Sequence, residues 1–351
     1  MDEVKLVTLT RSNLESVELG FTRTLMALLL AFLPSKLKVS AYRFGGARIG
    51  KHVSIGFGSI VSASSFTKIS IGDYSQIRQF TLIICSDVSI GSYSEIAMFV
   101  WIWGAGNLRI GDKCYVGPRC IINIRRNSFE MGEYAGLGPG SVAYTHGQWL
   151  PYTQGWPRTY GDVTLEEYAW VPAKVFLSPG VRIGKKSIVG SGAVVTKDIP
   201  PFSFAAGVPA RVIGPVERTM KQIDREELFR RVMEIAEDLP HFFGLKWETR
   251  QIEDKLAVVQ FNKRRGLRHR KWCLVVCEPE LADKLKDCEI DPACGRIVFS
   301  TGPLSEVSRK SCYSWYDLNS LRCSDISDSF AFEIWDFLRH TWCVTCTASS
   351  S

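Results

Sequence analysis

The sequence predicts an all-β parallel β-helix built from hexapeptide repeats, with helical caps and a small C-terminal α/β domain. Two observations carry this prediction. Between residues 47 and 214, aliphatic residues followed by a small residue recur about every six positions. Stronger marks of the form aliphatic-Gly-polar begin at Ile71, Ile90, Ile110 and Met131, with spacings of 19, 20 and 21 residues.

A period of six matches neither an amphipathic helix nor an isolated strand. It matches a coil in which each hexapeptide supplies one short strand and one corner. The aliphatic residue then faces inward, and the small residue occupies the corner, where glycine tolerates unusual backbone angles. Coils of about 18 residues stack at about 4.8 Å, the strand spacing of any sheet, and only the stack buries the apolar faces.

The elements follow in chain order. Residues 1–46 predict an N-terminal cap, mostly helical across 12–43, which covers the exposed strand edge of the first coil. Residues 47–214 form the coils. Residues 148–162 (QWLPYTQGWPRTYGD) break the rhythm and predict a loop that leaves the coil, and such loops often carry function.

Residues 215–351 contain no hexapeptides and predict a separate region. It begins with a charged amphipathic helix across 215–238, expected to close the far end of the coil. An accessory α/β domain follows, with strands expected at 256–261, 272–277 and 296–300, and helices expected at 279–286 and 330–340.

The composition excludes several classes of protein. The chain has 351 residues, a formal charge of +7, 46% apolar and 23% charged residues, which is ordinary for a globular protein and excludes disorder or collagen. The apolar stretch Leu25–Pro34 is too short to cross a bilayer and lacks a convincing cleavage site. A cytoplasmic location is expected, with peripheral contact at the inner face of the membrane as an alternative. The eleven cysteines are then mostly thiols.

An ordered set of motifs lies between Trp170 and Gly214. It includes PGVRIG at 179–184, VVTKDIP at 194–200 and AGVPARVI at 206–213. This set resembles the hexapeptide-repeat acyltransferases, especially the galactoside, maltose and capsular-polysaccharide O-acetyltransferases. The resemblance implies a left-handed coil, acetyl-CoA as co-substrate, and a homotrimer whose sites lie between neighbouring prisms.

His146 is the candidate catalytic residue. It precedes the interruption within Ala143-Tyr144-Thr145-His146-Gly147 and lies 24 residues before Trp170. The resemblance implies a catalytic histidine at that distance. An imidazole titrates near pH 6.5, so it can accept a proton from an attacking hydroxyl and return it at neutral pH. Which amide stabilises the oxyanion is not readable from the sequence.

The resemblance also implies residues that hold the substrates. Ala173 and Ser191 would lie along the pantetheine arm, and Thr196, Lys197 and Arg211 near the nucleotide, where Lys and Arg suit a phosphate. For Lys197 and Arg211, solvated surface charge is the alternative. Further residues are candidates for acceptor binding, with structural packing as the alternative: Asn123, Trp149, Tyr152 and Trp156, together with Tyr160.

The function predicted from these residues is transfer of an acetyl group from acetyl-CoA to a sugar hydroxyl in surface-polysaccharide or lipopolysaccharide synthesis. A sugar-nucleotide N-acyltransferase and a non-enzymatic scaffold remain alternatives. A zinc site of the γ-carbonic-anhydrase kind needs three histidines, and the coils offer His52 and His146 only, so no metal is expected.

Two C-terminal features remain. Eight cysteines follow residue 270, but only Cys343 and Cys346 form a CxxC pair, so free thiols are expected. The basic run 263–271 predicts a solvated hairpin loop. Contact with an anionic membrane or a lipid-linked glycan is the alternative, and nucleic acid is not expected as a partner.

Overall fold

The computed structural model divides by its internal contacts into two compact units, Met1–Met220 and Lys221–Ser351. Each unit is described by itself. The structure describes residues 29–147, 150–219, 223–265, 268–286, 295–310, 312, 314–319, 321–324, 329–342, 344 and 347–348.

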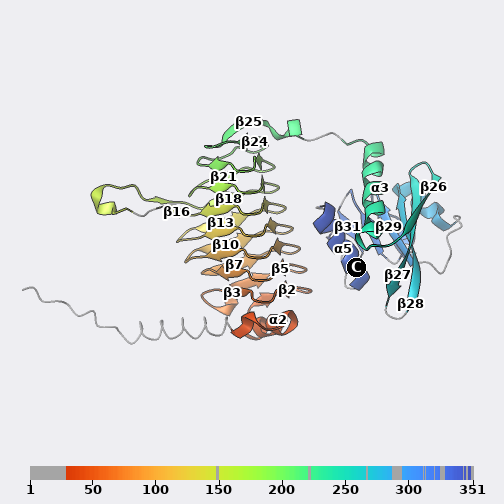
Figure 1. Ribbon diagram of the computed structural model, residues 1–351, viewed down its shortest axis with the longest axis horizontal. Coiled ribbons are helices and arrows are strands. Elements are labelled where there is room, and N and C mark those ends of the chain that lie inside the picture. The colour runs from red at the N-terminus through yellow and green to blue at the C-terminus, as the bar shows by residue number, and fades with distance from the viewer. Residues whose placement is uncertain are drawn as a thin grey trace, which may run out of the picture. The chain divides into compact units, whose positions relative to one another are not determined.

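The first unit is a stack of coils with three parallel sheets, consistent with a left-handed β-helix (Figure 1). Sheet A consists of β1 (Arg48–Ile49), β4 (Ile69–Ile71), β7 (Asp87–Ile90), β10 (Asn107–Ile110), β13 (Ser128–Met131), β18 (Val163–Leu165) and β21 (Arg182–Ile183). Sheet B consists of β2 (Ser54–Ile55), β5 (Gln76–Ile77), β8 (Glu95–Ile96), β11 (Tyr115–Val116), β14 (Gly136–Leu137), β19 (Trp170–Val171), β22 (Ile188–Val189), β24 (Ser203–Ala206) and β25 (Arg211–Pro215). Sheet C consists of β3 (Ile60–Ser62), β6 (Leu82–Ile84), β9 (Trp101–Trp103), β12 (Ile121–Asn123), β15 (Val142–Tyr144), β20 (Phe176–Leu177) and β23 (Val194–Val195). The six-residue rhythm therefore correctly predicted the parallel coils.

The interior of the coils consists of aliphatic ladders. Sheet B contributes Ile55, Ile77, Ile96, Val116 and Leu137, all of them fully buried. Burial of each such side chain stabilises the fold by about 1.5–3 kcal/mol relative to exposure.

Some corner glycines have a different role from the one expected. Gly72 follows β4, and a Cβ placed on it would lie 2.4 Å from the backbone nitrogen of Ser92 in the next coil. The left-handed backbone angle falls two residues later, on Tyr74 with φ 57°. At this corner glycine permits close stacking of the coils, and Tyr74 adopts the left-handed conformation. Gly140 and Gly192, at the corner between sheets B and C, do have the positive φ that was expected.

The N-terminal end of the coil is covered by helical segments. Residues 29–31 are helical, and α2 (Ser35–Phe44) contacts the first strands. Lys38 is fully buried and donates hydrogen bonds to the carbonyls of Ala31 (2.8 Å), Gly56 (2.6 Å) and Ser59 (3.2 Å). It therefore ties the helical segment at Ala31 to the first coil at Gly56 and Ser59. The rest of the expected helix, across 12–28, lies outside the described residues.

At the other end, β25 turns back and pairs antiparallel with β24. A short helical turn follows as η3 (Val216–Thr219). The amphipathic helix expected across 215–238 is α3 (Arg225–Phe242), which begins at its N-cap Asp224. Its buried residues face the sheet of the second unit, where it contacts β26, β27, β28 and β29. The apolar face of α3 therefore covers the sheet of its own unit.

The second unit is a mixed seven-stranded sheet with helices. Its strands, in sheet order, are β26 (Trp247–Glu253), β27 (Leu256–Arg265), β28 (Arg268–Cys277), β29 (Gly295–Ser300), β30 (Ser314–Asp317), β31 (Arg322–Cys323) and β32 (Thr347–Ala348). The other elements are η4 (Pro279–Lys286), α4 (Glu306–Lys310) and α5 (Ser329–Trp342). In the described part of the chain, no helix combines the length and apolar character needed to span a bilayer.

Candidate functional site

His146 lies where the coil opens between sheets C and A. After β15 the chain enters β16 (His146–Gly147), which pairs antiparallel with β17 (Thr159–Tyr160). The hairpin between them contains η2 (Tyr152–Gln154) and stands out from the stack of coils (Figure 1). Pro151 precedes η2, and Gly155 ends it with φ 86°. These residues turn the chain and return it to the coil at Val163.

The imidazole of His146 is half-buried between two tyrosines. Its ring centroid lies 6.0 Å from that of Tyr144, edge to face, and 6.5 Å from that of Tyr160, with planes inclined by 25°. Its Nδ1 is buried and has no hydrogen-bond partner among the described residues. The side chain therefore retains a nitrogen with hydrogen-bonding capacity that its own fold leaves unused.

The surroundings of His146 lower its pKa from the ordinary value of 6.5. Burial is the larger cause, and the positive charge of Arg125 is the second. Both disfavour the imidazolium. The neutral ring, which is able to accept a proton, therefore predominates at pH 7.

Thr145 fixes the base of the hairpin. Its amide donates to the carbonyl of Asn123 (3.1 Å), and its carbonyl accepts from the amide of Gly161 (3.1 Å). Its Oγ1 accepts a hydrogen bond from the amide of Arg125 (2.8 Å). Thr145 thus holds both ends of the hairpin and the turn of the preceding coil around His146.

Asn123 lies at the same corner as His146. It ends β12, in register with Tyr144 on the next rung and Trp103 on the previous one. Its side chain is half-buried on the outer face of sheet C. The structure thus brings this predicted acceptor-binding residue to the corner that holds His146.

The residues predicted to bind CoA lie in three places. Ala173 and Ser191 occupy the corner between sheets B and C, on successive rungs, where the amide of Gly192 donates to the carbonyl of Ala173 (3.0 Å). Thr196 and Lys197 follow β23 and are exposed. Arg211 lies on β25 and donates to the carbonyl of Ala210 (2.8 Å). Within one chain, sheet C therefore separates Ala173 and Ser191 from His146.

The outer face of sheet C is apolar along most of its length. Trp101 and Ile84 are 54% and 41% exposed. The outward-facing positions of its strands are Ile60, Ser62, Leu82, Ile84, Trp101, Trp103, Ile121, Asn123, Val142, Tyr144, Phe176 and Val194. A contiguous apolar surface of this kind is typical of a protein interface.

The predicted aromatic residues of the loop do not gather at His146. Tyr152 and Trp156 lie in the projecting part of the hairpin and are 62% and 48% exposed. Trp149 lies outside the described residues. Tyr160, across the ribbon from His146, is the one aromatic residue of this loop that the structure places beside the imidazole.

The sequence analysis missed Arg125, Arg126 and Arg158 as site residues. Arg158 donates to the hydroxyl of Tyr160 from Nε (3.0 Å) and Nη2 (2.7 Å). Arg125 and Arg126 lie in the turn between β12 and β13, one rung before His146. The 21-residue spacing from Ile110 to Met131 was a signal, because residues beyond 18 must leave the coil at a corner.

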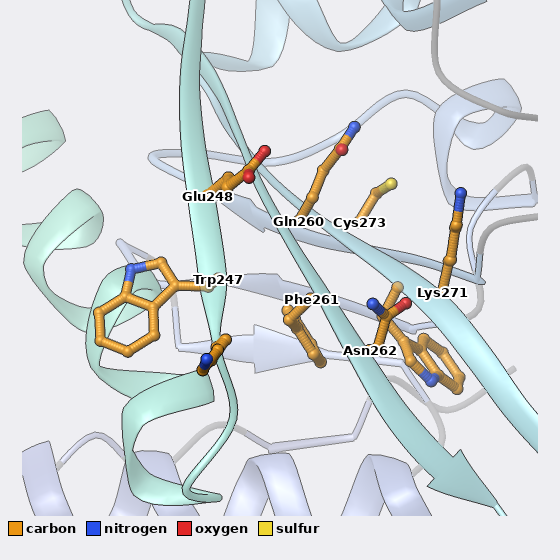
Figure 2. A pocket seen from close by; sticks show the side chains of 9 residues that line it. Trp247, Glu248, Gln260, Phe261, Asn262, Lys271 and Cys273 are labelled. Carbon is orange, nitrogen blue, oxygen red and sulfur yellow. The ribbon is translucent and has the colours of Figure 1, made fainter.

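A separate cavity of about 380 Å³ lies in the second unit, on strands β26, β27 and β28. Figure 2 shows Glu248, Gln260 and Lys271 among its lining side chains. It contains none of the candidate catalytic, CoA-binding or acceptor-binding residues, although Lys271 of the basic run 263–271 lines it.

Two further predictions concern the second unit. Among the described residues, no three His, Cys, Asp or Glu side chains converge as metal ligands. Cys273, Cys277, Cys312 and Cys323 are free thiols, whereas the other four C-terminal cysteines lie outside the described residues. In the basic run, Lys263 forms an ion pair with Glu333 and lies over the rings of Phe243 and Phe330. Lys263 is therefore held by its own domain, and the side chains of 264–270 are not described.

Comparison with known proteins relates the coils to acetyltransferases. Galactoside O-acetyltransferase of Escherichia coli is 51% identical over 51 residues, 14% of this chain and 25% of that protein. A protein provisionally named an acetyltransferase in Schizosaccharomyces pombe is 46% identical over 116 residues, 32% of this chain and 54% of that protein. No family profile matches the chain.

The alignments cover a quarter to somewhat more than half of these curated relatives. Among solved structures, a hexapeptide-repeat acetyltransferase of Vibrio cholerae complexed with acetyl coenzyme A matches with a TM-score of 0.33 and 19% identity, over 59% of this chain and 90% of that one. In sequence, part of the chain is similar to acetyltransferases. Its relatives include galactoside O-acetyltransferase, so the resemblance predicted from the motifs is confirmed.

Proposed function

We propose that the protein transfers an acetyl group from acetyl-CoA to a sugar hydroxyl, with His146 as the general base. The main support is the state of this imidazole: half-buried at a coil corner, with a lowered pKa and an unpartnered Nδ1 among the described residues. It lies 24 residues before Trp170, in coils related in sequence to acetyltransferases. The proposal includes a left-handed winding of the coils.

The chemistry is a direct transfer. The acceptor hydroxyl gives its proton to the imidazole of His146 while its oxygen bonds to the thioester carbonyl carbon. The tetrahedral intermediate then collapses as the carbon–sulfur bond breaks. The imidazolium returns the proton to the departing thiolate, so that CoA leaves as the thiol and the sugar as its acetyl ester. Such a base contributes about 10²–10⁴-fold to the rate.

The active site in this proposal is completed by a second copy of the chain, in a homotrimer. Ala173 and Ser191 lie at one edge of sheet C and His146 at the other, with an apolar face between them. Packing that face against a neighbouring prism would bury it and bring the CoA-binding corner of one copy to His146 of the next. Threefold closure lets every copy use the same two surfaces.

The corner between sheets B and C changes along the stack in a way that suits a pantetheine arm. In the early coils this corner carries Phe80 and Phe99, which are about half exposed. In the later coils it carries Gly140, the exposed Lys174 and Gly192, and a Cβ on Gly192 would meet no atom within 4 Å. The corner is thus open at Gly192, next to Ser191, and the exposed Thr196, Lys197 and Arg211 are candidates to hold the phosphates.

We further propose that the acceptor is a sugar of a surface-polysaccharide or lipopolysaccharide precursor. Acetyl-CoA would be incubated with hydroxyl and amino sugars, and CoA release would be followed with a thiol-trapping dye. The variants are His146→Asn and, as matched control, His52→Asn at an exposed corner of the first coil. We expect release with hydroxyl acceptors by wild type and His52→Asn, and loss of release with retained CoA binding in His146→Asn. No CoA binding by the wild type would favour a scaffold, and release with amino sugars alone would favour N-acylation.

A further inference from the structure

Three arginines surround the aromatic ring that faces His146. The ring is that of Tyr160, and the guanidinium carbon of Arg158 lies 4.7 Å from its centroid. Hydrogen bonds from Arg158 lower the pKa of Tyr160, and the charges of Arg158, Arg125 and Arg126 act in the same direction. All three guanidinium groups therefore lie near enough to act electrostatically on one phenol.

The two arginines of the turn are held beside His146 by their backbone. The amide of Arg125 donates to Oγ1 of Thr145, the residue before His146. Arg126 follows in the left-handed conformation, with φ 65°. Because Thr145 also pairs with Asn123 and Gly161, the turn, the imidazole and Tyr160 form one anchored corner.

This corner lacks acidic partners in the part of the chain that the structure describes. No carboxylate there forms an ion pair with Arg125, Arg126 or Arg158, all of which are exposed. The neighbouring Asp162 instead accepts from the amide of Ser128 (2.7 Å) and from the side chain of Asn127 (3.3 Å). Arg125, Arg126 and the part of the Arg158 guanidinium that does not donate to Tyr160 therefore remain available for an anion from outside the chain.

The phosphates of CoA are poorly placed to be that anion. His146 must contact the thioester, and the pantetheine arm separates the thioester from every phosphate of the coenzyme. The basic residues proposed for the phosphates, Lys197 and Arg211, lie two or more rungs further along the stack. An anion bound by these arginines, next to the reacting end of CoA, would therefore belong to the acceptor.

We propose that the acceptor is an anionic sugar, whose carboxylate or phosphate is bound by Arg125, Arg126 and Arg158 while its hydroxyl lies against His146. This inference rests on the proposed acetyl transfer and adds the class of acceptor. Guanidinium forks bind carboxylates and phosphates through paired hydrogen bonds. Such an anchor fixes which hydroxyl reaches the imidazole, which is the positioning that a direct transfer needs.

The test measures acceptor binding by calorimetry on the full chain saturated with CoA, so that no turnover is needed. The ligands are galactose, galacturonate, galactose 1-phosphate and inorganic phosphate. The variant is Arg125→Gln/Arg126→Gln/Arg158→Gln, and the control is Arg48→Gln, an exposed arginine on β1 of sheet A. CoA affinity of each variant, measured on the same preparations before CoA is added, shows whether the coils are intact.

We expect at least one charged ligand to bind about ten-fold or more tightly than galactose in wild type and Arg48→Gln, as charged hydrogen bonds predict. The triple variant should lose that difference and keep its affinity for CoA. Binding of galacturonate but not phosphate identifies a carboxylate acceptor, and the reverse identifies a phosphorylated one. Equal binding of galactose and both charged sugars, or no binding of any charged ligand, overturns the proposal. If charged ligands bind but CoA is never released, the proposed acetyl transfer fails while the anion site stands.

Discussion

His146 and Tyr160 face each other across a two-stranded ribbon, in register, with ring centroids 6.5 Å apart. The ribbon brings residues that are 14 positions apart in the sequence to one corner of the coil. Arg125, which precedes His146 in the sequence, acts electrostatically on both His146 and Tyr160. Arg158, which follows His146, acts on Tyr160. The predictions below begin at this corner and extend to the coils that support it.

The first prediction concerns pH. Burial and Arg125 lower the pKa of His146, so kcat/KM should rise with pH through an acid limb centred below 6.5 and then level off. In Arg125→Ser the imidazolium loses a repelling charge, so the limb should move upward, towards 6.5. A pH profile of CoA release checks both. A limb that is unmoved in Arg125→Ser would show that the titrating group is not His146 or that Arg125 does not act on it.

The second prediction concerns Thr145. In Thr145→Val the amide of Arg125 loses its acceptor, which costs about 1–3 kcal/mol of unfolding free energy. Because the turn of Arg125 also loosens, KM for the acceptor should rise while CoA affinity stays. Denaturant unfolding and steady-state kinetics measure these effects. Thr164→Val on the outer face of sheet A is the matched control, and an equal loss in both variants would contradict the assigned role.

The third prediction concerns coil stacking. In Gly72→Ala the new methyl group would lie 2.4 Å from the backbone nitrogen of Ser92, so the coils must move apart. We expect a loss of about 1–3 kcal/mol, typical of overpacking. Gly155→Asn in the projecting hairpin, where a Cβ meets nothing within 4 Å, should cost less. Thermal unfolding of the two variants decides between close stacking and backbone conformation as the reason for the corner glycines.

The fourth prediction concerns the buried lysine of the N-terminal end. Lys38→Met removes a donor from three carbonyls. The carbonyls of Ala31 and Gly56 keep the amides of Gly58 and Ser59 as donors, so the carbonyl of Ser59 is the most affected, and a buried acceptor left unpaired costs roughly 1–3 kcal/mol. A fall of about 1–3 kcal/mol in unfolding free energy is expected. The exposed Lys36→Met should be within about 0.5 kcal/mol of wild type, as surface changes usually are. Similar stabilities of the two variants would mean that water replaces the lysine.

The fifth prediction concerns assembly. Trp101→Arg places a charge on the outer face of sheet C, where the side chain is 54% exposed. If this face packs between copies, sedimentation should show a shift from three chains to one, and acetyl transfer should fall with it. Ser70→Arg on sheet A should leave the mass unchanged. A trimer that survives Trp101→Arg would place the interface elsewhere.

The coils could be predicted from the sequence alone, because their signal is local and repeated. Ile71, Ile90 and Ile110 each report the same inward position, so the period is readable without knowledge of any contact. Counting along the sequence also showed that His146 lies just before the interruption and 24 residues before Trp170. Strands after residue 238, such as the one at 256–261, could also be predicted, because a mostly apolar run of this kind is contiguous in the chain.

Which residues share a corner with His146 could not be predicted, because it depends on how the rungs stack. Arg125, Thr145 and Tyr160 meet there because stacking brings the turn of one rung against the hairpin of the next. Ala173 and His146 are separated by the width of sheet C because each coil has three strands and three corners. Ala173 lies at the corner before a strand of sheet C, and His146 lies at the corner after one. The spacing of the repeats predicts how many residues each coil contains, but not which side chains meet at one corner. The charges around His146 therefore became known only from the fold.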